Sequence, residues 1–306
     1  MNVVIMGAGA VGGYFGAVLS KNGVDVTMVA RGSHLSAMKK NGLSVESYWG
    51  DFVVKTNFTE SLDALTPVDL IIHSTKLYSN NESLPLLKSV IGPKTTILTL
   101  QNGIGSGAII AGFYGWDKVL QGATYVESVI KSPGHIQQSG SMAKIEFGEK
   151  DGSVTTRTKV IKDLLEMEGI QTEISNDINS TLWAKMVSVG AIGTLLTAAR
   201  SSLVELLTDE FGANTLTTVM EEIVAVGKAN GIYFPPNVVD EKFSIASREA
   251  AEFKSSLQYD FNNQKPLELD DILGTVVRQG LDKGIPVPAS MTLMSVLNKF
   301  KKGAIS

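Results

Sequence analysis

The sequence predicts two domains: an α/β domain with a doubly wound parallel sheet, followed by an all-α domain. Two observations predict this class. Strand-like and helix-like segments alternate through the first half, whereas nearly every segment after residue 179 has helical character. The chain also has 306 residues, 43% of them hydrophobic, which is enough for two cores. We place the domain boundary near residue 175, giving domains of 1–175 and 176–306.

The first domain is predicted element by element from apolar runs rich in Val and Ile. Strand–helix alternation implies a parallel sheet with helices on both faces. The expected strands are 2–6, 24–29, 69–73, 95–100 and 119–129, with a helix over 10–22 that stops at Gly23. A hairpin or pair of strands over 134–148, an amphipathic helix over 154–168 and a last strand over 170–174 complete the domain.

The second domain is predicted to consist of helices connected by short loops. Their apolar residues recur with helical spacing. The expected helices cover residues 180–200, 209–230, 235–252, 267–283 and 289–301.

Composition excludes several classes of function. The net charge of −4, without a dense Lys/Arg cluster, predicts no nucleic-acid partner. The absence of cysteine excludes thiolate nucleophiles and Cys-ligated metals, and His34, His73 and His135 lack metal-ligand spacing, so we expect no metal site. Uncharged stretches over 1–20 and 95–116 are too rich in glycine for membrane spans. We expect a soluble protein, and a cysteine-free chain fits a cytoplasmic enzyme.

The strongest local signal is a glycine-rich turn between the first strand and the first helix. A GxGxxG at this place predicts a dinucleotide site, in which the glycines permit the tight turn, the close approach of a pyrophosphate and close helix–strand packing. The residues are Gly7, Ala8, Gly9, Ala10, Val11 and Gly12. The alternative is a merely glycine-rich turn.

The end of the second strand indicates which dinucleotide binds. An NAD site usually has Asp or Glu there, on the ribose 2′-hydroxyl. This chain has no acid there and instead carries Arg31, whose guanidinium can bind a 2′-phosphate. The sequence therefore favours NADPH/NADP, the alternative being a solvated surface arginine.

Candidate catalytic residues follow two predicted strands and lie on one apolar helix. Lys76 follows the strand 69–73, and Asn102 follows 95–100, at the strand ends where ligands bind in open α/β sheets. Lys185 is the only charged residue between Asp177 and Arg200. Partial burial near a cleft would make it a usable proton donor. Each residue also has a purely structural interpretation. Lys76 would be a surface lysine, Asn102 part of an Asn-Gly turn, and Lys185 a lysine that extends out of a packed helix.

Two further polar positions lie near the C-terminus. Ser256 follows Ser255, and Glu268 follows Lys265-Pro266. An acid just after a proline also fits the first turn of a helix, where it stabilises the helix dipole, so spacing alone does not make Glu268 a site residue.

Taken together, these motifs resemble one known family. The ordered set consists of the glycine loop, Arg31, Lys76, Gln101-Asn102-Gly103-Ile104-Gly105, Trp183-x-Lys185, Ser256, Glu268 and Gly284-Ile285-Pro286-Val287-Pro288. In order and spacing it resembles the ketopantoate reductase (2-dehydropantoate 2-reductase) family over essentially the whole chain.

The resemblance implies a fold, a reaction and residue roles. The first domain would be of Rossmann type and the second similar to the C-terminal domain of 6-phosphogluconate dehydrogenase. The reaction would be NADPH-dependent reduction of a small 2-oxo acid, 2-dehydropantoate to pantoate in pantothenate biosynthesis. By resemblance, Lys185 is the general acid and Glu268 hydrogen-bonds the substrate hydroxyl. Ser256 holds substrate, while Lys76 and Asn102 contact cofactor or substrate.

The chain departs from the family pattern at two positions. Typical members carry Asn four and eight residues after the catalytic lysine, where this chain has Val189 and Gly193. Thr194, Thr197 and Arg200 are the nearest polar residues that follow. Three alternatives therefore stay open: a paralogous reductase of another 2-oxo acid, an opine- or hydroxyacid-type dehydrogenase, and an NADP-binding sensor without turnover. The sequence is consistent both with a homodimer formed through apolar helix faces and with a monomer.

Overall fold

The computed structural model describes residues 1–303 and divides into two compact units. The N-terminal unit comprises residues 1–101 and 106–178. The helical unit comprises residues 102–105 and the chain from residue 179 onward. The short segment Asn102–Gly105 thus belongs with the helices, although its chain neighbours on both sides belong to the N-terminal unit.

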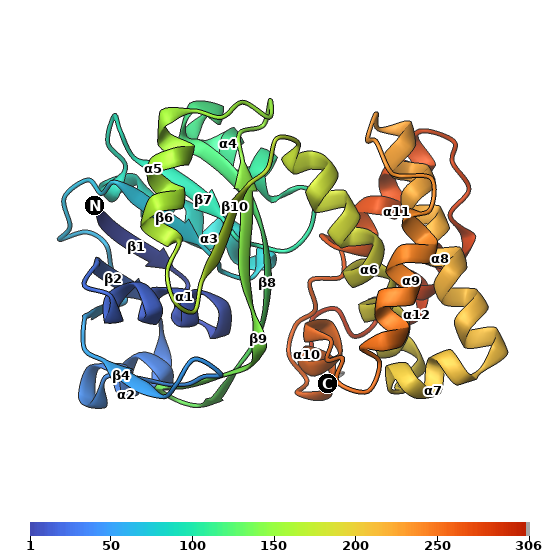
Figure 1. The fold of residues 1–306 in the computed structure, drawn as a ribbon, viewed down its shortest axis with the longest axis horizontal. Helices are drawn as coiled ribbons and strands as arrows, with labels where there is room; N and C mark the ends of the chain where they lie inside the picture. The colour runs from blue at the N-terminus through green and yellow to red at the C-terminus, as the bar shows by residue number, and fades with distance from the viewer. Residues whose placement is uncertain (304–306) are drawn as a thin grey trace. The chain divides into compact units, whose positions relative to one another are not determined.

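The N-terminal unit is built on one mixed sheet of ten strands (Figure 1). The strand order is β4-β3-β9-β8-β7-β6-β1-β2-β5, and β10 pairs with β9. From β8 to β5 the neighbours run parallel, whereas the β8–β9 pair is antiparallel. The strands are β1 (Asn2–Met6), β2 (Asp25–Val29), β3 (Leu43–Glu46), β4 (Phe52–Val54), β5 (Asn57–Thr59), β6 (Leu70–His73), β7 (Thr96–Thr99), β8 (Val119–Ser132), β9 (His135–Gly148) and β10 (Gln171–Ile174).

Helices cover both faces of this sheet. They are α1 (Ala10–Lys21), α2 (Gly32–Asn41), α3 (Asn80–Leu86), α4 (Ser106–Tyr114) and α5 (Thr156–Leu165), with single 3-10 turns at Leu77–Ser79, Leu87–Val90 and Trp116–Lys118. Successive side chains of β1 point to opposite faces. Val3 and Ile5 join one buried cluster with α1 and α5, whereas Val4 and Met6 join another with α3 and α4. The predicted doubly wound α/β class is confirmed.

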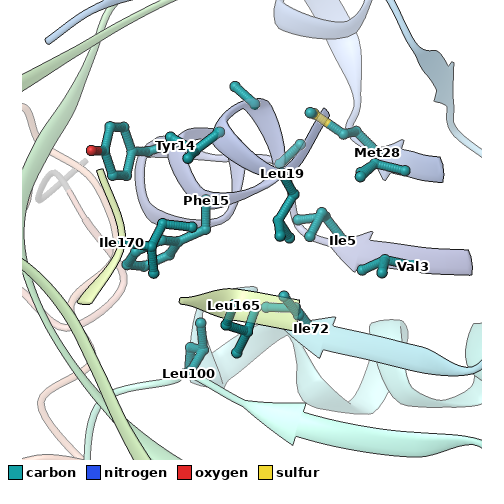
Figure 2. Packing of buried hydrophobic residues seen from close by; sticks show 14 of the residues in the cluster. Val3, Ile5, Tyr14, Phe15, Leu19, Met28, Ile72, Leu100, Leu165 and Ile170 are labelled. Atoms are coloured by element: carbon teal, nitrogen blue, oxygen red, sulfur yellow. The ribbon is translucent and has the colours of Figure 1, made fainter. Parts of the chain in front are cut away.

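The first of these clusters fixes α1, the helix that follows the glycine loop. Figure 2 shows Phe15 and Leu19 of α1 packed among Ile5, Leu165 and Ile170. Phe15 and Leu19 are fully buried. Burying a large apolar side chain contributes about 1.5–3 kcal/mol, so these contacts hold α1 firmly against β1.

The helical unit contains α6 (Ile178–Ala199), α7 (Leu203–Thr208), α8 (Glu210–Ala229), α9 (Val238–Arg248), α10 (Ser256–Asn262), α11 (Leu273–Asp282) and α12 (Pro288–Asn298). Its core centres on α8, which contacts α7, α9, α11 and α12. Glu222 of α8 is buried, and its carboxylate accepts hydrogen bonds of 2.8 Å from the backbone N–H groups of Ala289 and Ser290. This side chain caps the N-terminus of α12, where an anion is favourable.

One helix among residues 1–303, α6, is long and apolar enough to span a membrane by length and composition alone. A buried core helix meets the same criteria. About 67% of its most apolar window is buried, and Met186, Val187 and Leu196 lie in the main core of the helical unit. Its apolar character is thus used in packing.

The structure corrects the predicted start of one helix. The helix expected over 267–283 begins only at Leu273. Residues 267–272 form an irregular turn, closed by a hydrogen bond from the Ile272 N–H to the Glu268 carbonyl oxygen. The prediction of this helix start was wrong because a proline followed by an acid, here Pro266 and Glu268, also occurs in irregular turns. Glu268 therefore does not cap a helix.

Candidate active site

The glycine loop joins β1 to α1 and depends on the absence of side chains at two positions. Gly7 has φ +98°, a conformation that favours glycine. A Cβ on Gly7 would lie 2.8 Å from the backbone nitrogen of Thr75. A Cβ on Gly12 would lie 2.1 Å from Ser74 Oγ and 2.4 Å from the Gly7 carbonyl oxygen. Both glycines thus let the loop and α1 pack against the end of β6.

Gly9 has a different surrounding. A Cβ at this position would meet nothing within 4 Å, so the loop is open to an approaching group there. Gly9 precedes the first turn of α1, whose N-terminus has no side-chain cap. The first backbone N–H groups of a helix form a binding site for phosphate. The loop therefore fits a pyrophosphate.

A cavity of about 280 Å³ adjoins this loop, entirely within the N-terminal unit. Its wall joins the glycine loop to the end of β2 and to the segment after β6. The lining residues are Met6, Gly7, Ala8, Gly9, Val29, Ala30, Arg31, His34, Thr75, Ser79, Ser83 and Ile130. Ala10, Val11 and Gly12 of the predicted motif form the first turn of α1 and are not among these lining residues.

Arg31 lies at the edge of this cavity, at the N-cap position of α2. Its guanidinium forms an exposed ion pair of 3.3 Å with Glu82 of α3. Exposed ion pairs contribute only about 0–1 kcal/mol, so a phosphate could readily displace Glu82. The absence of an acid at the end of β2 and the presence of this arginine fit a nucleotide carrying a 2′-phosphate. Glu82 was not found by sequence reasoning, because its proximity to Arg31 depends on the fold.

Lys76 follows Ser74 and Thr75 after the end of β6 and occupies the N-cap position of the short turn Leu77–Ser79. Its carbonyl oxygen accepts a hydrogen bond of 2.9 Å from the Ser79 N–H. Its side chain is partly buried. The structure thus places Lys76 in the segment that forms the cavity wall, although not among the lining residues.

Lys185 and Asn102 meet inside the helical unit. Lys185 projects from the middle of α6, and its Nζ donates a hydrogen bond of 3.0 Å to Asn102 Oδ1. Burial lowers the pKa of Lys185 from 10.5 to about 8, and the negative charge of Glu268 partly offsets this shift. An ammonium with a pKa near 8 is an effective proton donor at neutral pH. These residues are far apart in sequence, so only the fold brings them together.

Glu268 supplies the negative charge of this group. It is buried, with 4% of its surface exposed, between the buried Leu267 and Leu269 in the turn before α11. Burial, together with the charges of Glu268 and Asp270, raises the pKa of Asp271. The turn therefore concentrates carboxyl groups on the helical unit, and Glu268 acts electrostatically on Lys185.

The positions that depart from the family pattern are closely packed. Gly193 is buried, and a Cβ on it would lie 3.0 Å from Ser255 Oγ and 3.8 Å from Leu257 Cβ. The glycine thus lets the start of α10 approach α6 closely. An asparagine at position 193 would require Ser255 to move. Val189 is partly buried and adds no polar group.

The polar residues that follow Gly193 do not replace the missing amides. The hydroxyls of Thr194 and Thr197 each donate a 2.6 Å hydrogen bond to the carbonyl oxygen four residues earlier in α6, and both side chains are buried. Arg200 lies with its guanidinium carbon 5.5 Å from the ring centroid of Phe261. This stretch of α6 is therefore less polar than two asparagines would make it.

Ser256 is the first residue of α10 and is exposed. The preceding Ser255 is buried, and its side chain accepts a hydrogen bond of 3.3 Å from the Gln258 N–H. Sequence reasoning missed this helix. The pattern Ser255-x-x-Gln258, typical of a helix N-terminus, was a signal that could have revealed it.

The comparisons with known proteins cover both units. The family described as "Ketopantoate reductase PanE/ApbA" matches residues 3–152, and "Ketopantoate reductase PanE/ApbA C terminal" matches residues 177–301. The chain belongs to the ketopantoate reductase family. The resemblance inferred from the sequence is confirmed, and the chain is an oxidoreductase of this family.

Individual members of the family resemble this chain at modest sequence identity. A 2-dehydropantoate 2-reductase of Pyrococcus abyssi is 30% identical over 300 residues, covering 97% of each chain. The crystal structure of a 2-dehydropantoate 2-reductase from Geobacter metallireducens GS-15 is 26% identical, with a TM-score of 0.92 over 98% of this chain and 99% of that one. A D-mandelate dehydrogenase solved with NADH is 25% identical, with a TM-score of 0.87 over 98% and 99%. The fold thus occurs in enzymes that are named for more than one substrate.

Proposed function

We propose that the protein catalyses the NADPH-dependent reduction of a 2-oxo acid to the 2-hydroxy acid, with 2-dehydropantoate as the first substrate to test. The observation that carries the proposal is the group formed by Lys185, Asn102 and Glu268. A partly buried lysine held by an amide oxygen and close to the charge of a buried carboxylate is a costly arrangement for stability alone. It is well suited to proton donation, which argues against a nucleotide sensor without turnover.

The chain's residues supply the acid chemistry of this reaction. When bound, the dinucleotide supplies the hydride that reaches the carbonyl carbon of the substrate. The carbonyl oxygen then gains negative charge, and the Lys185 ammonium stabilises that charge and transfers its proton to the oxygen. Asn102 holds Nζ through its Oδ1, which restricts the direction in which the ammonium points. Glu268 keeps Lys185 protonated against the effect of burial and offers a carboxylate to the substrate hydroxyl.

The N-terminal unit binds the dinucleotide in this proposal. The backbone N–H groups at the start of α1 hold the pyrophosphate, and the opening at Gly9 admits it. Arg31 binds the 2′-phosphate after releasing Glu82, which is the basis for preferring NADPH to NADH. We assign Lys76 a contact with cofactor or substrate and Ser256 a contact with substrate, as the family resemblance implies. We place the enzyme in the cytoplasm, in agreement with its cysteine-free composition.

A second candidate substrate class is favoured by the packing around Gly193. Because Ser255 and Leu257 fill the space that an asparagine would need, and because Val189 is apolar, the chain lacks two amides that typical members present to substrate. Losing two such hydrogen bonds, at about 1 kcal/mol each, would weaken recognition of 2-dehydropantoate by roughly tenfold or more. A 2-oxo acid with an apolar side chain would not incur this loss.

The test is a substrate panel with NADPH. Turnover is followed by the loss of NADPH absorbance with 2-dehydropantoate, branched 2-oxo acids and phenylglyoxylate. The highest kcat/KM on 2-dehydropantoate assigns the enzyme to pantoate synthesis, whereas a higher value on an apolar acid supports the second candidate. If NADPH binds and no 2-oxo acid is reduced, the proposed reductase function is wrong.

A further inference from the structure

A buried polar network lies behind the wall of the nucleotide cavity, within the N-terminal unit. Polar side chains are costly to bury unless their hydrogen bonds are satisfied, so a network of this size needs an explanation. Its members come from the ends of β6 and β7 and from the starts of α3 and α4. They are His73, Thr75, Asn80, Ser83, Thr99, Gln101 and Ser106.

Gln101 is the centre of this network. Its Nε2 donates to the carbonyl oxygen of Thr75 at 2.9 Å and to Asn80 Oδ1 at 2.6 Å. Its Oε1 accepts from Ser106 Oγ at 2.6 Å and from Asn80 Nδ2 at 3.3 Å. The amide therefore uses both its donors and its acceptor, and it ties the backbone after β6 to the loop after β7.

His73 extends the network into the sheet. The ring is fully buried, and its Nε2 lies 3.1 Å from Asn80 Oδ1 and 3.2 Å from Thr75 Oγ1. Burial lowers the pKa of His73 to about 4. The ring is therefore neutral near pH 7, and because Asn80 Oδ1 can only accept, Nε2 carries the proton and donates to it. His73 thus fixes the orientation of the Asn80 amide, and Asn80 in turn fixes the orientation of the Gln101 amide.

One side of the network forms part of the cavity wall. Thr75 and Ser83 both line the cavity, and their hydroxyl oxygens lie 3.3 Å apart. Thr75 also abuts the glycine loop, because its backbone nitrogen would lie 2.8 Å from a Cβ on Gly7. Any movement of Thr75 would thus alter both the polar part of the cavity wall and the surface against which the glycine loop packs.

We propose that Gln101, Asn80 and His73 are positioning residues that hold Thr75 and Ser83 in place for dinucleotide binding. This inference rests on the proposed nucleotide site. The network holds a wall shared by NADPH and NADH, and it makes no contact with Arg31 among the hydrogen bonds of residues 1–303. Disturbing it should therefore weaken both dinucleotides equally, whereas loss of Arg31 should weaken NADPH selectively.

The test compares two near-isosteric variants that flank the same strand, β7. Gln101→Met removes the central amide beyond the carboxyl end of β7. The control, Thr95→Val, removes a buried hydroxyl at the other end of β7, where Thr95 Oγ1 hydrogen-bonds Val68 O and the Gly92 N–H. Both variants should lose thermal stability to a similar extent. Only Gln101→Met should raise the Kd of NADPH and of NADH, by about tenfold each, as measured by titrating the intact protein.

A second pair of variants keeps the proposal testable if Gln101→Met fails to fold. The amide nitrogen of glutamine occupies nearly the same place as histidine Nε2, so His73→Gln should retain binding while His73→Leu weakens it by several-fold. Equal Kd values for these two variants would overturn the proposal, as would a destabilised Gln101→Met protein with wild-type Kd values. Arg31→Ala in the same titrations reports on the 2′-phosphate site separately. Wild-type protein that binds neither dinucleotide would contradict both the proposed function and this inference.

Discussion

Replacing Lys185 with methionine should remove most of the catalysis and yet make the protein more stable. Burial lowers the pKa of Lys185 from 10.5 to about 8. At about 1.4 kcal/mol for each pKa unit, holding the charged form in the folded protein costs roughly 3 kcal/mol. The substitution also removes the hydrogen bond to Asn102, worth about 1 kcal/mol, and Lys185 is only partly buried. We therefore expect a net gain of about 1–2 kcal/mol, or roughly 2–3 °C in Tm for a chain of 306 residues.

The pH dependence of this gain has a definite sign. Below pH 8 the lysine is protonated in both the folded and the unfolded chain, so the cost of burying its charge is present in full. As the pH rises above about 8, the folded protein loses this proton and the cost falls, until it vanishes near pH 10.5. The stability difference between Lys185→Met and wild type should therefore be largest near pH 7 and should shrink towards pH 10.

The assay combines thermal unfolding with steady-state kinetics. For Lys185→Met, kcat should fall at least about a hundredfold while NADPH binding is retained. The matched control is Lys228→Met, at an exposed lysine in the last turn of α8, which should change stability by less than about 0.5 kcal/mol and leave kcat unaltered. Near-normal kcat in Lys185→Met would reject Lys185 as the proton donor. A lower Tm at pH 7 would refute the argument that its buried charge costs stability.

Three further substitutions test the cofactor site and the packing of α6. Arg31→Ala should raise the Kd of NADPH much more than that of NADH, because only NADPH carries the 2′-phosphate; equal losses in titrations would contradict this assignment. Glu82→Gln removes the carboxylate 3.3 Å from Arg31 and should tighten NADPH by about two- to fivefold at low salt, with little effect on NADH; weaker NADPH binding would show that Glu82 does not compete with the phosphate. Gly193→Asn places a Cβ 3.0 Å from Ser255 Oγ and should lower the free energy of unfolding by about 1–3 kcal/mol in denaturant titrations; an unchanged value would mean that α10 can move to admit the family's amide.

The central strands and the glycine loop could be predicted from the sequence because each carries a strong local signal. The strand expected over 2–6 is Asn2–Met6 in the structure, and the helix expected over 10–22 is Ala10–Lys21. In these segments apolar periodicity and tertiary packing agree. The hairpin or pair of strands expected over 134–148 is instead a single strand, His135–Gly148, which pairs antiparallel with β8.

Short and edge elements were missed because their stability comes from neighbours that are distant in sequence. Strands β3, β4 and β5 have three or four residues each, and β3 is held by pairing with β9. The helix α7 did carry a readable signal, since Ser202-x-x-Glu205 forms a capping box. The irregular turn at Glu268 had no such signal.

The sequence predicted which residues belong to the candidate site but not how they are arranged in space. Sequence reasoning selected Lys185, Asn102 and Glu268 but could not place them together, because 83 positions separate Asn102 from Lys185. The partnership of Arg31 with Glu82 and the approach of Ser255 to Gly193 likewise depend on tertiary packing. No local pattern indicates such contacts.

The measurement that tests the central claim most directly is the pH profile of kcat/KM for 2-oxo acid reduction with NADPH, using the best substrate of the panel. This profile reports the free enzyme, in which Lys185 has a pKa of about 8. If Lys185 donates the proton, kcat/KM should be level below pH 8 and fall about tenfold for each pH unit above it. A value that stays level or rises between pH 8 and 10 would contradict the claim that a protonated Lys185 drives the reduction.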